Sequence, residues 1–422
     1  RETMMAAGSF AVGWRQVGAS MALLAITAMI TSSYGVIAVP LGKEFHPSRM
    51  VLMLAMTVVS GVSAVISPFV GTLLDKISLR FAMALGGLML AAGYVAISFA
   101  HDFDQVLIVY GLLIAPANLL IGPLACSVLL TRWFSRRRGM ALGIAIAGIA
   151  LGGVIFPPLI QYLLSAFEWR MGMRMIAGIV IVISFVAAAL VVNRPAELGL
   201  YPDGANADPE SSAGERGNKD KSSLGLALAL ICDPTFWMVA VLVATVTAGL
   251  KGMVTNLPSL ANDQGISAAS AAFLVSIYAT SGFVSKLGFA AMADRMNPRH
   301  LMAISLIGYS LGCTCMIFAE GGYTIIAAGV VLMGFFGGMM MPMESFLIPR
   351  IWGREVVGRV GGMLNLVILS FLLVSPPLFG RIFDVTGSYD AIFMTFAGLA
   401  IFMLLLVPVV RLALKQPEVQ TG

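Results

Sequence analysis

Charged side chains are scarce in this chain of 422 residues, at 11% of the total. A soluble domain carries about a quarter charged residues, so this shortage excludes an ordinary soluble protein. Histidine (three) and cysteine (four) are also rare, and no metal-ligand cluster or Ser/His/Asp pattern is present. A P-loop pattern is absent, which excludes ATP-driven chemistry of the usual kind. We therefore expect neither an enzyme nor a metal or cofactor site.

Long apolar runs take the place of charge. The chain is 59% hydrophobic, its mean hydropathy is +0.93, and runs of about 20 apolar residues recur along its whole length. Each run can cross roughly 30 Å of hydrocarbon as a helix, whereas the ten-residue alternation of membrane β-strands is absent. The fold prediction is an all-α membrane protein of twelve transmembrane helices. The predicted spans are 17–39, 52–74, 81–100, 106–131, 139–163, 174–193, 236–260, 269–292, 301–319, 323–348, 360–382 and 389–412.

A set of residues that recurs at one constant offset indicates that the chain is duplicated. Asp75 recurs as Asp294, which sets the offset (294 − 75 = 219). The other pairs at this offset are Arg80 and Arg299, Trp133 and Trp352, Gly139 and Gly358, and Pro157-Pro158 and Pro376-Pro377. We predict two pseudo-symmetric six-helix bundles, at 1–193 and 236–422, joined by a linker at 194–235 that is too polar to bury a core of its own.

The Lys and Arg residues predict the orientation. Nineteen of them lie on one side of the predicted spans and five on the other. By the positive-inside rule, both termini and the linker are expected in the cytoplasm, and the chain in the inner (plasma) membrane. The formal charge of +5 then follows membrane topology, so the expected partner is a lipid bilayer and not a nucleic acid. No pattern predicts an oligomeric state.

The loop after the second span resembles the signature between helices 2 and 3 of the major facilitator superfamily. Gly71, Asp75 and Arg80 match that signature. A looser counterpart lies at the repeat offset in the second half, and the resemblance implies that the charges of both loops latch the two halves together. The expected latch residues are Asp75, Arg80, Asp294 and Arg295. The alternative is that these loop charges only set the topology.

Within that superfamily, the chain resembles the monocarboxylate transporter family and its oxalate–formate exchanger relatives. The segments that match are Trp133-Phe134, Arg137-Arg138-Gly139, Pro157-Pro158-Leu159 and Pro376-Pro377-Leu378. The resemblance implies secondary active transport of small organic anions by alternating access, commonly with protons, for monocarboxylates such as lactate-like acids. An organic anion exchanger of the oxalate–formate type is the alternative.

Three ionisable side chains lie inside predicted spans: Lys251, Lys286 and Glu344. A lysine at the centre of a span costs roughly 2.5–3.5 kcal/mol, so such groups usually face a cavity or a partner. Lys286, with Tyr278 on the same helix face, is expected to bind the substrate carboxylate. The alternative is a lysine that snorkels or pairs with an acidic residue. Lys251 is either a second anion contact or another snorkelling lysine.

Glu344 lies shortly before Arg350 in the sequence, so it is either a structural ion pair or a proton site. Tyr34, Asn118 and Asn365 are uncharged candidates for the cavity wall, although a polar side chain between membrane helices is as often a packing hydrogen bond.

One departure from the family pattern concerns protons. Some monocarboxylate transporters carry a cation in the eighth span, where this chain has Lys286, and an aspartate one turn before it, where this chain has Gly282. We therefore hypothesise that Lys286 itself carries the proton and loses it when the cavity is empty. Lys286 and Glu344 are the proton-coupling candidates.

Overall fold

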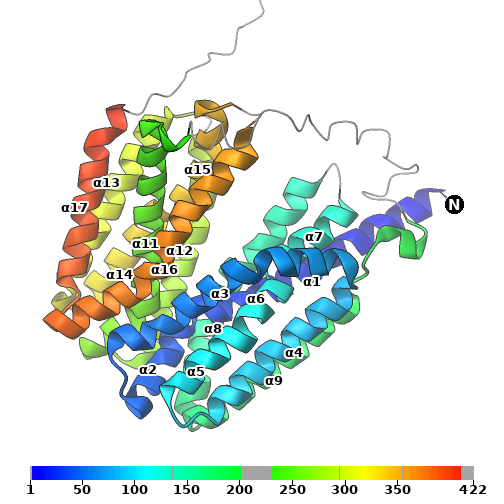
Figure 1. The fold of residues 1–422 in the computed structure, drawn as a ribbon, viewed down its shortest axis with the longest axis horizontal. Helices are drawn as coiled ribbons and strands as arrows, with labels where there is room; N and C mark the ends of the chain where they lie inside the picture. The colour runs from blue at the N-terminus through cyan, green and yellow to red at the C-terminus, as the bar shows by residue number, and fades with distance from the viewer. Residues whose placement is uncertain (1, 135–136, 201–229, 294, 354–355, 410–422) are drawn as a thin grey trace, which may run out of the picture. The chain divides into compact units, whose positions relative to one another are not determined.

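The computed structural model describes residues 2–134, 137–200, 230–293, 295–353 and 356–409, and every long element among them is a helix (Figure 1). The first part of the chain contains α1 (Glu2–Ser32), α2 (Tyr34–Phe45), α3 (Arg49–Lys76), α4 (Leu79–Ser98), α5 (Phe103–Val109), α6 (Ala115–Ile121), α7 (Pro123–Trp133), α8 (Arg138–Ala166) and α9 (Trp169–Leu190). The second contains α11 (Pro234–Asp263), α12 (Ala268–Ala293), α13 (Pro298–Ile317), α14 (Tyr323–Leu332), α15 (Met340–Ile351), α16 (Val357–Thr386) and α17 (Asp390–Leu406).

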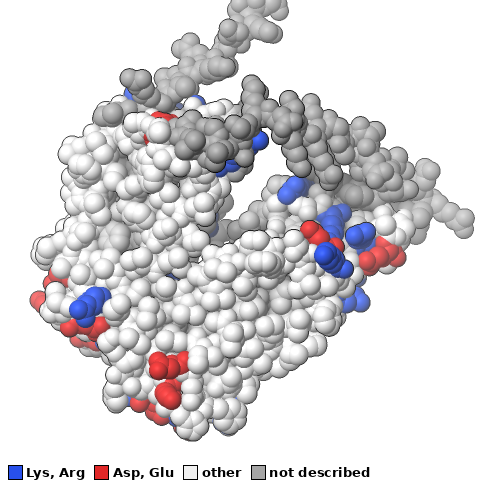
Figure 2. Space-filling view, viewed as in Figure 1, with Lys and Arg blue, Asp and Glu red and all other residues white. Residues whose placement is uncertain are grey.

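These helices supply the twelve predicted spans. In the described part of the chain, ten helices are long and apolar enough to cross a membrane, some of them built from several consecutive segments. The stretch Val12–Ser32 and α2 form one further span, bent by 41° at Ser33. The shorter apolar helix α17 lies within the last predicted span, 389–412. Figure 2 shows the result on one face, where Lys, Arg, Asp and Glu gather in patches and uncharged residues cover most of the surface.

The duplication is visible in the bounds of the helices. Shifting the bounds of α4 by the repeat offset gives those of α13, and α8 corresponds in the same way to α16 within one position. The caps are repeated too. The Ser78 side chain accepts a hydrogen bond at the start of α4, and Asn297, its counterpart at the repeat offset, does so at the start of α13. The repeat therefore describes two copies of one helical unit.

The double prolines lie inside their helices, as the predicted spans 139–163 and 360–382 place them. Pro157 and Pro158 lie inside α8, which continues to Ala166, and Pro376 and Pro377 lie inside α16, which continues to Thr386. Proline is tolerated within membrane helices because neighbouring groups and local adjustments satisfy the freed carbonyls.

The fourth span, in the first copy, and the tenth span, in the second, are both irregular. The fourth contains a π-helical turn at Tyr110–Ile114 and a break at Gly122, whose backbone is extended. The tenth contains a π-helical turn at Met333–Gly337 before α15 begins at Met340. Such turns leave backbone groups outside the regular helical pattern and often mark functional sites.

The chain divides into two compact units. The first comprises Arg1–Asn218 and Thr255–Thr280, and the second comprises Lys219–Val254 and Ser281–Gly422. The residues at which α11 and α12 pass from one unit to the other lie inside these helices. The predicted bundle limits at 193 and 236 remain a prediction, and residues 201–229 of the linker lie outside the described residues.

In the first unit, α1 packs along α8, and α4 packs along α9. The α1–α8 seam depends on glycine, because a Cβ atom on Gly148 or Gly152 would come within 2.2 Å of a carbonyl oxygen of α1. The α4–α9 seam is similar, with Gly87 directly against Ser184. Small residues let helix backbones approach closely in a bilayer, where apolar burial gives no drive between helices.

In the second unit, α13 packs against α14 and α17. Helix α11 meets α16 where Gly252 lies against Phe379, and where the Ser375 hydroxyl donates a hydrogen bond to the Ala248 carbonyl. Phe379 also stacks on Phe396 of α17, with ring centroids 5.6 Å apart. These contacts fix the helices that carry the charged candidates.

Candidate functional site

The candidate residues are divided between the two units. Lys251 on α11, Lys286 on α12, Glu344 on α15 and Asn365 on α16 belong to the second unit. Tyr34 on α2, Asn118 on α6 and Tyr278 on α12 belong to the first.

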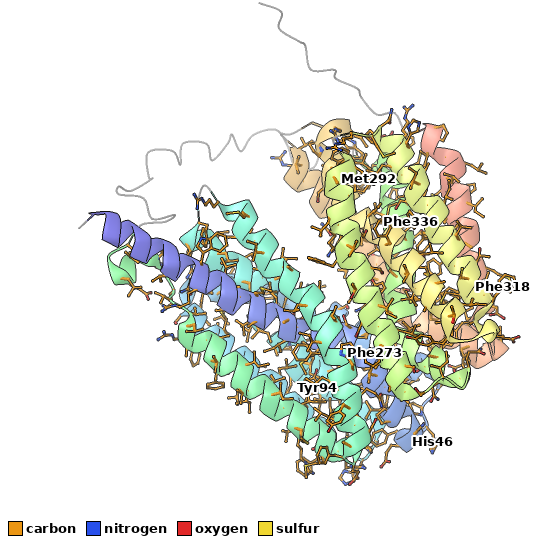
Figure 3. All side chains as sticks on the ribbon, turned by 180° about the vertical axis from the view of Figure 1, so that it is seen from behind. His46, Tyr94, Phe273, Met292, Phe318 and Phe336 are labelled. Carbon is orange, nitrogen blue, oxygen red and sulfur yellow. The ribbon has the colours of Figure 1, made fainter. Side chains whose placement is uncertain are left out.

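Lys286 lies at the border between the packed and the exposed faces of α12. At 100° per residue, Ser285 and Phe289 lie to one side of it and are buried, whereas Phe283 and Leu287 lie to the other side and are exposed. Lys286 itself is exposed. Figure 3 labels Phe273 and Met292 near the two ends of this helix, so Lys286 lies in its second half.

The packed face of α12 lies against the tenth span. A Cβ atom on Gly338 would be 3.0 Å from the Ser285 hydroxyl, and the Phe289 and Phe346 rings meet edge to face with centroids 5.7 Å apart. Glu344 lies half-buried on the same span. The helices that carry Lys286 and Glu344 are therefore packed together.

Neither of these two side chains makes an ion pair with another described residue. The expected pairing of Glu344 with Arg350 is not formed, because the Arg350 guanidinium lies over the Phe346 ring at 3.4 Å from its centroid. An ionisable group in a span is costly without a partner or water. Glu344 stays a candidate proton site and Lys286 a candidate anion contact.

Lys251 is half-buried on α11, between two close helix contacts. The next residue, Gly252, lies against Phe379 and Ser375 of α16, and Gly249 lies against the Tyr309 hydroxyl of α13. The backbone around Lys251 is thus held from two sides.

Asn365 on α16 is exposed, and its contact is local. Its amide nitrogen donates a hydrogen bond to the Gly361 carbonyl, one turn earlier on the same helix, at 2.9 Å. Its role at the cavity wall stays a prediction.

Tyr34 is fully buried in the first unit, and its phenol is engaged with the protein itself. Its hydroxyl donates to the Leu52 carbonyl, and its ring meets Tyr110 edge to face with centroids 5.4 Å apart. Both contacts are of the packing type. Whether Tyr34 also contributes to a cavity wall stays a prediction.

Asn118 lies half-buried in the fourth span, one turn before the break at Gly122 and one turn after the π-helical turn Tyr110–Ile114.

Tyr278 is half-buried on the stretch of α12 that packs on α8. That contact is made by its neighbours: the Ser276 hydroxyl donates to the Val154 carbonyl at 2.7 Å, and Ala279 meets Gly153.

Of the predicted latch residues, Arg80 has a clear structural partner within the first unit. Its Nε and Nη2 donate to the carbonyls of Val191 and Ala189, at 3.0 and 2.9 Å, and so satisfy the end of α9. Asp75 is exposed in the last turn of α3, and Arg295 is exposed after α12. Asp294 lies outside the described residues, so the latch stays a prediction.

Two ion pairs near the ends of the helices were not predicted from the sequence. Arg49 pairs with Asp263 at 2.6 Å, and Arg170 pairs with Glu44 at 2.8 Å. Both arginines belong to the five Lys and Arg residues that lie on the predicted outer side of the membrane. Their partners lie 214 and 126 residues away in sequence, and no local pattern indicates them. No group of three metal-ligating side chains occurs among the residues described.

Comparison with known proteins identifies the family of this chain. The model of the Major Facilitator Superfamily matches residues 20–285 and 241–421, which together span nearly the whole chain.

Curated relatives and a solved structure agree with that match. Monocarboxylate transporter 12 of Rattus norvegicus is 25% identical over 438 residues, covering 97% of this chain and 87% of its own length. Monocarboxylate transporter 13 of the same organism is 26% identical over 386 residues, covering 90% and 85%. The crystal structure of the nucleoside transporter NupG has a TM-score of 0.71 at 13% identity, covering 94% of this chain and 98% of that one.

Proposed function

We propose, from the premise that this chain belongs to the Major Facilitator Superfamily and is a multi-pass membrane transporter and not an enzyme, that it carries small organic anions by secondary active transport. The proposed substrates are monocarboxylates of the lactate type, moved with protons by alternating access. We propose further that both termini are cytoplasmic and that the membrane is the inner (plasma) membrane, because Lys and Arg gather on that side.

The observation that carries this proposal is the position of Lys286. It is a cation in a membrane span, it lies beside the packed face of α12, and no described acidic side chain forms an ion pair with it. A carboxylate supplied by the substrate would give it a partner in a low-dielectric surrounding. The curated relatives, which are named monocarboxylate transporters, support the same substrate class.

The irregular fourth and tenth spans support alternating access. Transporter sites are typically built at discontinuous helices near the midplane, where unpaired backbone groups and inward side chains meet the substrate. Asn118 lies one turn after the π-helical turn of the fourth span, and Glu344 lies about two turns after that of the tenth. Lys251, Tyr278, Tyr34 and Asn365 are the further proposed cavity residues.

Proton coupling is proposed to use Lys286 itself. The position one turn earlier is Gly282, so no carboxylate stands there to take the proton. A lysine in an apolar surrounding releases its proton more readily than one in water, and an arginine does not. Binding of an anion would favour the protonated lysine, so that anion and proton move together.

The test is uptake of labelled pyruvate into proteoliposomes that contain the purified full-length protein. An inward pH gradient should drive uptake above equilibrium, and Lys286→Ala should abolish it. Lys286→Arg should still exchange pyruvate across the membrane but should not couple uptake to the gradient. Leu287→Ala is the matched control, because Leu287 is the next residue on α12, is 59% exposed and should transport normally when truncated. If Lys286→Ala takes up pyruvate as the unaltered protein does, the proposal is wrong.

An organic anion exchanger of the oxalate–formate type is the second candidate, and the glycine at position 282 favours it. A carrier that lacks a proton acceptor beside its cation could reset by returning a second anion. In that case uptake requires anion inside the proteoliposomes and is insensitive to the pH gradient. The two candidates therefore separate in one experiment with empty and pyruvate-loaded vesicles.

A further inference from the structure

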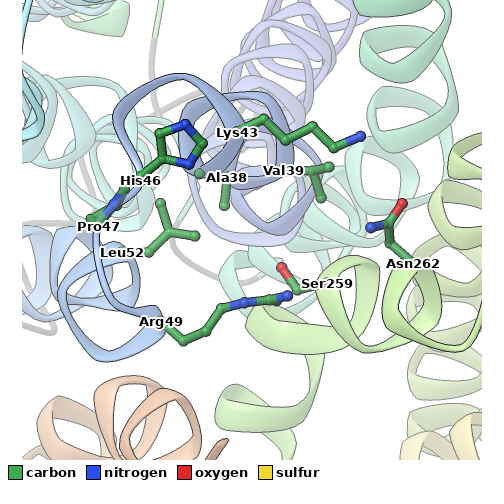
Figure 4. A pocket seen from close by; sticks show the side chains of 10 residues that line it. Ala38, Val39, Lys43, His46, Pro47, Arg49, Leu52, Ser259 and Asn262 are labelled. Atoms are coloured by element: carbon green, nitrogen blue, oxygen red, sulfur yellow. The ribbon is translucent and has the colours of Figure 1, made fainter. Parts of the chain in front are cut away.

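A cavity of about 250 Å³ lies in the first unit, at the end of the helices opposite the N-terminus (Figure 4). The last turn of α2, the turn at 46–48, the start of α3 and the end of α11 surround it. This end is the predicted outer side of the membrane. Neither Lys286 nor Lys251 lines it, so it is distinct from the proposed transport site.

The turn between α2 and α3 brings three basic side chains together around the cavity. Lys43 is in the last turn of α2, Arg49 is the first residue of α3, and His46 lies between them. His46 has a φ of 50°, a left-handed conformation that few residues other than glycine adopt, and its backbone N–H donates to the Gly42 carbonyl. The Ser48 hydroxyl then caps α3 by accepting a hydrogen bond from the Val51 backbone N–H in the first turn of the helix. Two helix ends fix the positions of these side chains.

The electrostatics of the cavity favour an anion. Two permanent cations, Lys43 and Arg49, are among its lining residues, and no carboxylate is. Of the nearby carboxylates, Asp263 pairs with Arg49 at 2.6 Å and Glu44 pairs with Arg170 at 2.8 Å. Lys43 makes no ion pair with another described residue. The first turn of α3 adds the positive end of a helix dipole on the same side.

The rest of the lining suits an organic anion. Ser259 and Asn262 of α11 contribute a hydroxyl and an amide, and Figure 4 shows both side chains beside the same cavity as Arg49 and Lys43. Aliphatic surface comes from the neighbouring α2 and α3 side chains Ala38, Val39 and Leu52. The volume lies below that of cavities for drug-sized ligands, so the ligand has only a few heavy atoms. Chloride or inorganic phosphate would leave the aliphatic surface unused.

We propose that this cavity binds a small carboxylate through Lys43 and Arg49, with a hydrogen bond from Ser259 and the aliphatic side chains against the organic part. The site would hold anions at the outer ends of the helices whether or not they are transported. It does not rest on the role proposed for Lys286.

The experiment is protection of a cysteine placed in the cavity. Asn262→Cys in the full-length protein, in nanodiscs of phosphatidylcholine, is treated with N-ethylmaleimide at constant ionic strength while pyruvate is titrated. Mass spectrometry of the peptides follows modification of the introduced thiol. The native exposed Cys232 is an internal control, and Gln264→Cys, on an exposed residue two positions further on that does not line the cavity, is the matched control.

Pyruvate should protect the thiol introduced by Asn262→Cys saturably and leave both controls unaffected. Lys43→Gln should raise the half-protecting concentration about three- to fivefold, as expected for one partly screened charge contact. Lys43 is exposed, so this substitution leaves the fold intact. Protection should persist in Lys286→Ala, which separates this site from the transport site.

Four results would overturn the proposal. These are the absence of protection, equal protection after Lys43→Gln, loss of protection in Lys286→Ala, and protection by glycerol 3-phosphate or phosphatidylglycerol discs but not by pyruvate. The last result would assign the cavity to a lipid headgroup.

Discussion

The seam between α1 and α8 gives a quantitative prediction. Gly148→Ala would place a Cβ atom 2.2 Å from the Met21 carbonyl oxygen, where real Cβ contacts are no closer than about 3 Å. The obstacle is backbone, so no side chain can rotate away and the two helices must separate by about 1 Å to restore van der Waals contact. Overpacking of this kind costs about 1–3 kcal/mol. Gly148→Ala should therefore lower the apparent melting midpoint in detergent by about 4–8 °C for a cost near 2 kcal/mol.

Gly143→Ala is the control for this substitution. It lies on the same helix, but a Cβ atom there meets nothing within 4 Å. Both changes alter helix propensity equally, so only the close approach differs. Gly143→Ala should be neutral or slightly stabilising. The double variant Gly148→Ala with Gly152→Ala should lose less stability than the two single variants lose together, because one displacement of the helices relieves both contacts. Equal midpoints for Gly143→Ala and Gly148→Ala would refute the packing described for this seam.

Three further predictions concern polar contacts at the helix ends. Trp352→Phe removes the indole N–H that donates to the Asp233 carboxylate at 2.9 Å, and should destabilise the protein by about 1–2 kcal/mol, measured as a lower melting midpoint. A double-mutant cycle on Arg49→Ala and Asp263→Ala should give a coupling energy of about 0.2–1 kcal/mol, and a value of zero would contradict a formed ion pair. Arg80→Lys should lower the stability by about 1–2 kcal/mol in the same melting assay, since an ammonium cannot reproduce the fork that joins two carbonyls at the end of α9.

The fold was predictable because hydropathy and repetition act over long stretches of chain. The predicted span 81–100 corresponds to α4 (Leu79–Ser98), and the repeat offset reappears in the bounds of α13. The predictions of a twelve-helix major facilitator fold, of the monocarboxylate transporter resemblance and of a transporter that is not an enzyme are confirmed.

Local irregularities were not predictable in the same way. The bend at Ser33 and the π-helical turns at Tyr110–Ile114 and Met333–Gly337 depend on which carbonyl accepts each N–H. A hydropathy pattern averaged over about 20 residues does not contain that information.

The candidate site was predictable only in part. Burial cost indicates which charges are unusual, and so singled out Lys286 and Glu344, but it does not indicate partners. The Arg49–Asp263 pair joins residues 214 positions apart, and topology counting had assigned Arg49 only to a side of the membrane. Polarity alone likewise did not reveal that the Tyr34 hydroxyl is engaged by a backbone carbonyl of α3.

The most direct test of the account is binding of small carboxylates to the purified protein, followed by the melting midpoint. Ligand that binds only the folded state raises that midpoint by mass action. We expect at least one monocarboxylate to raise the midpoint of Lys43→Gln, in which the outer cavity binds more weakly, and to raise that of Lys43→Gln combined with Lys286→Ala by less. A carboxylate that stabilises this double variant as much as Lys43→Gln alone would contradict the claim that Lys286 holds the transported anion.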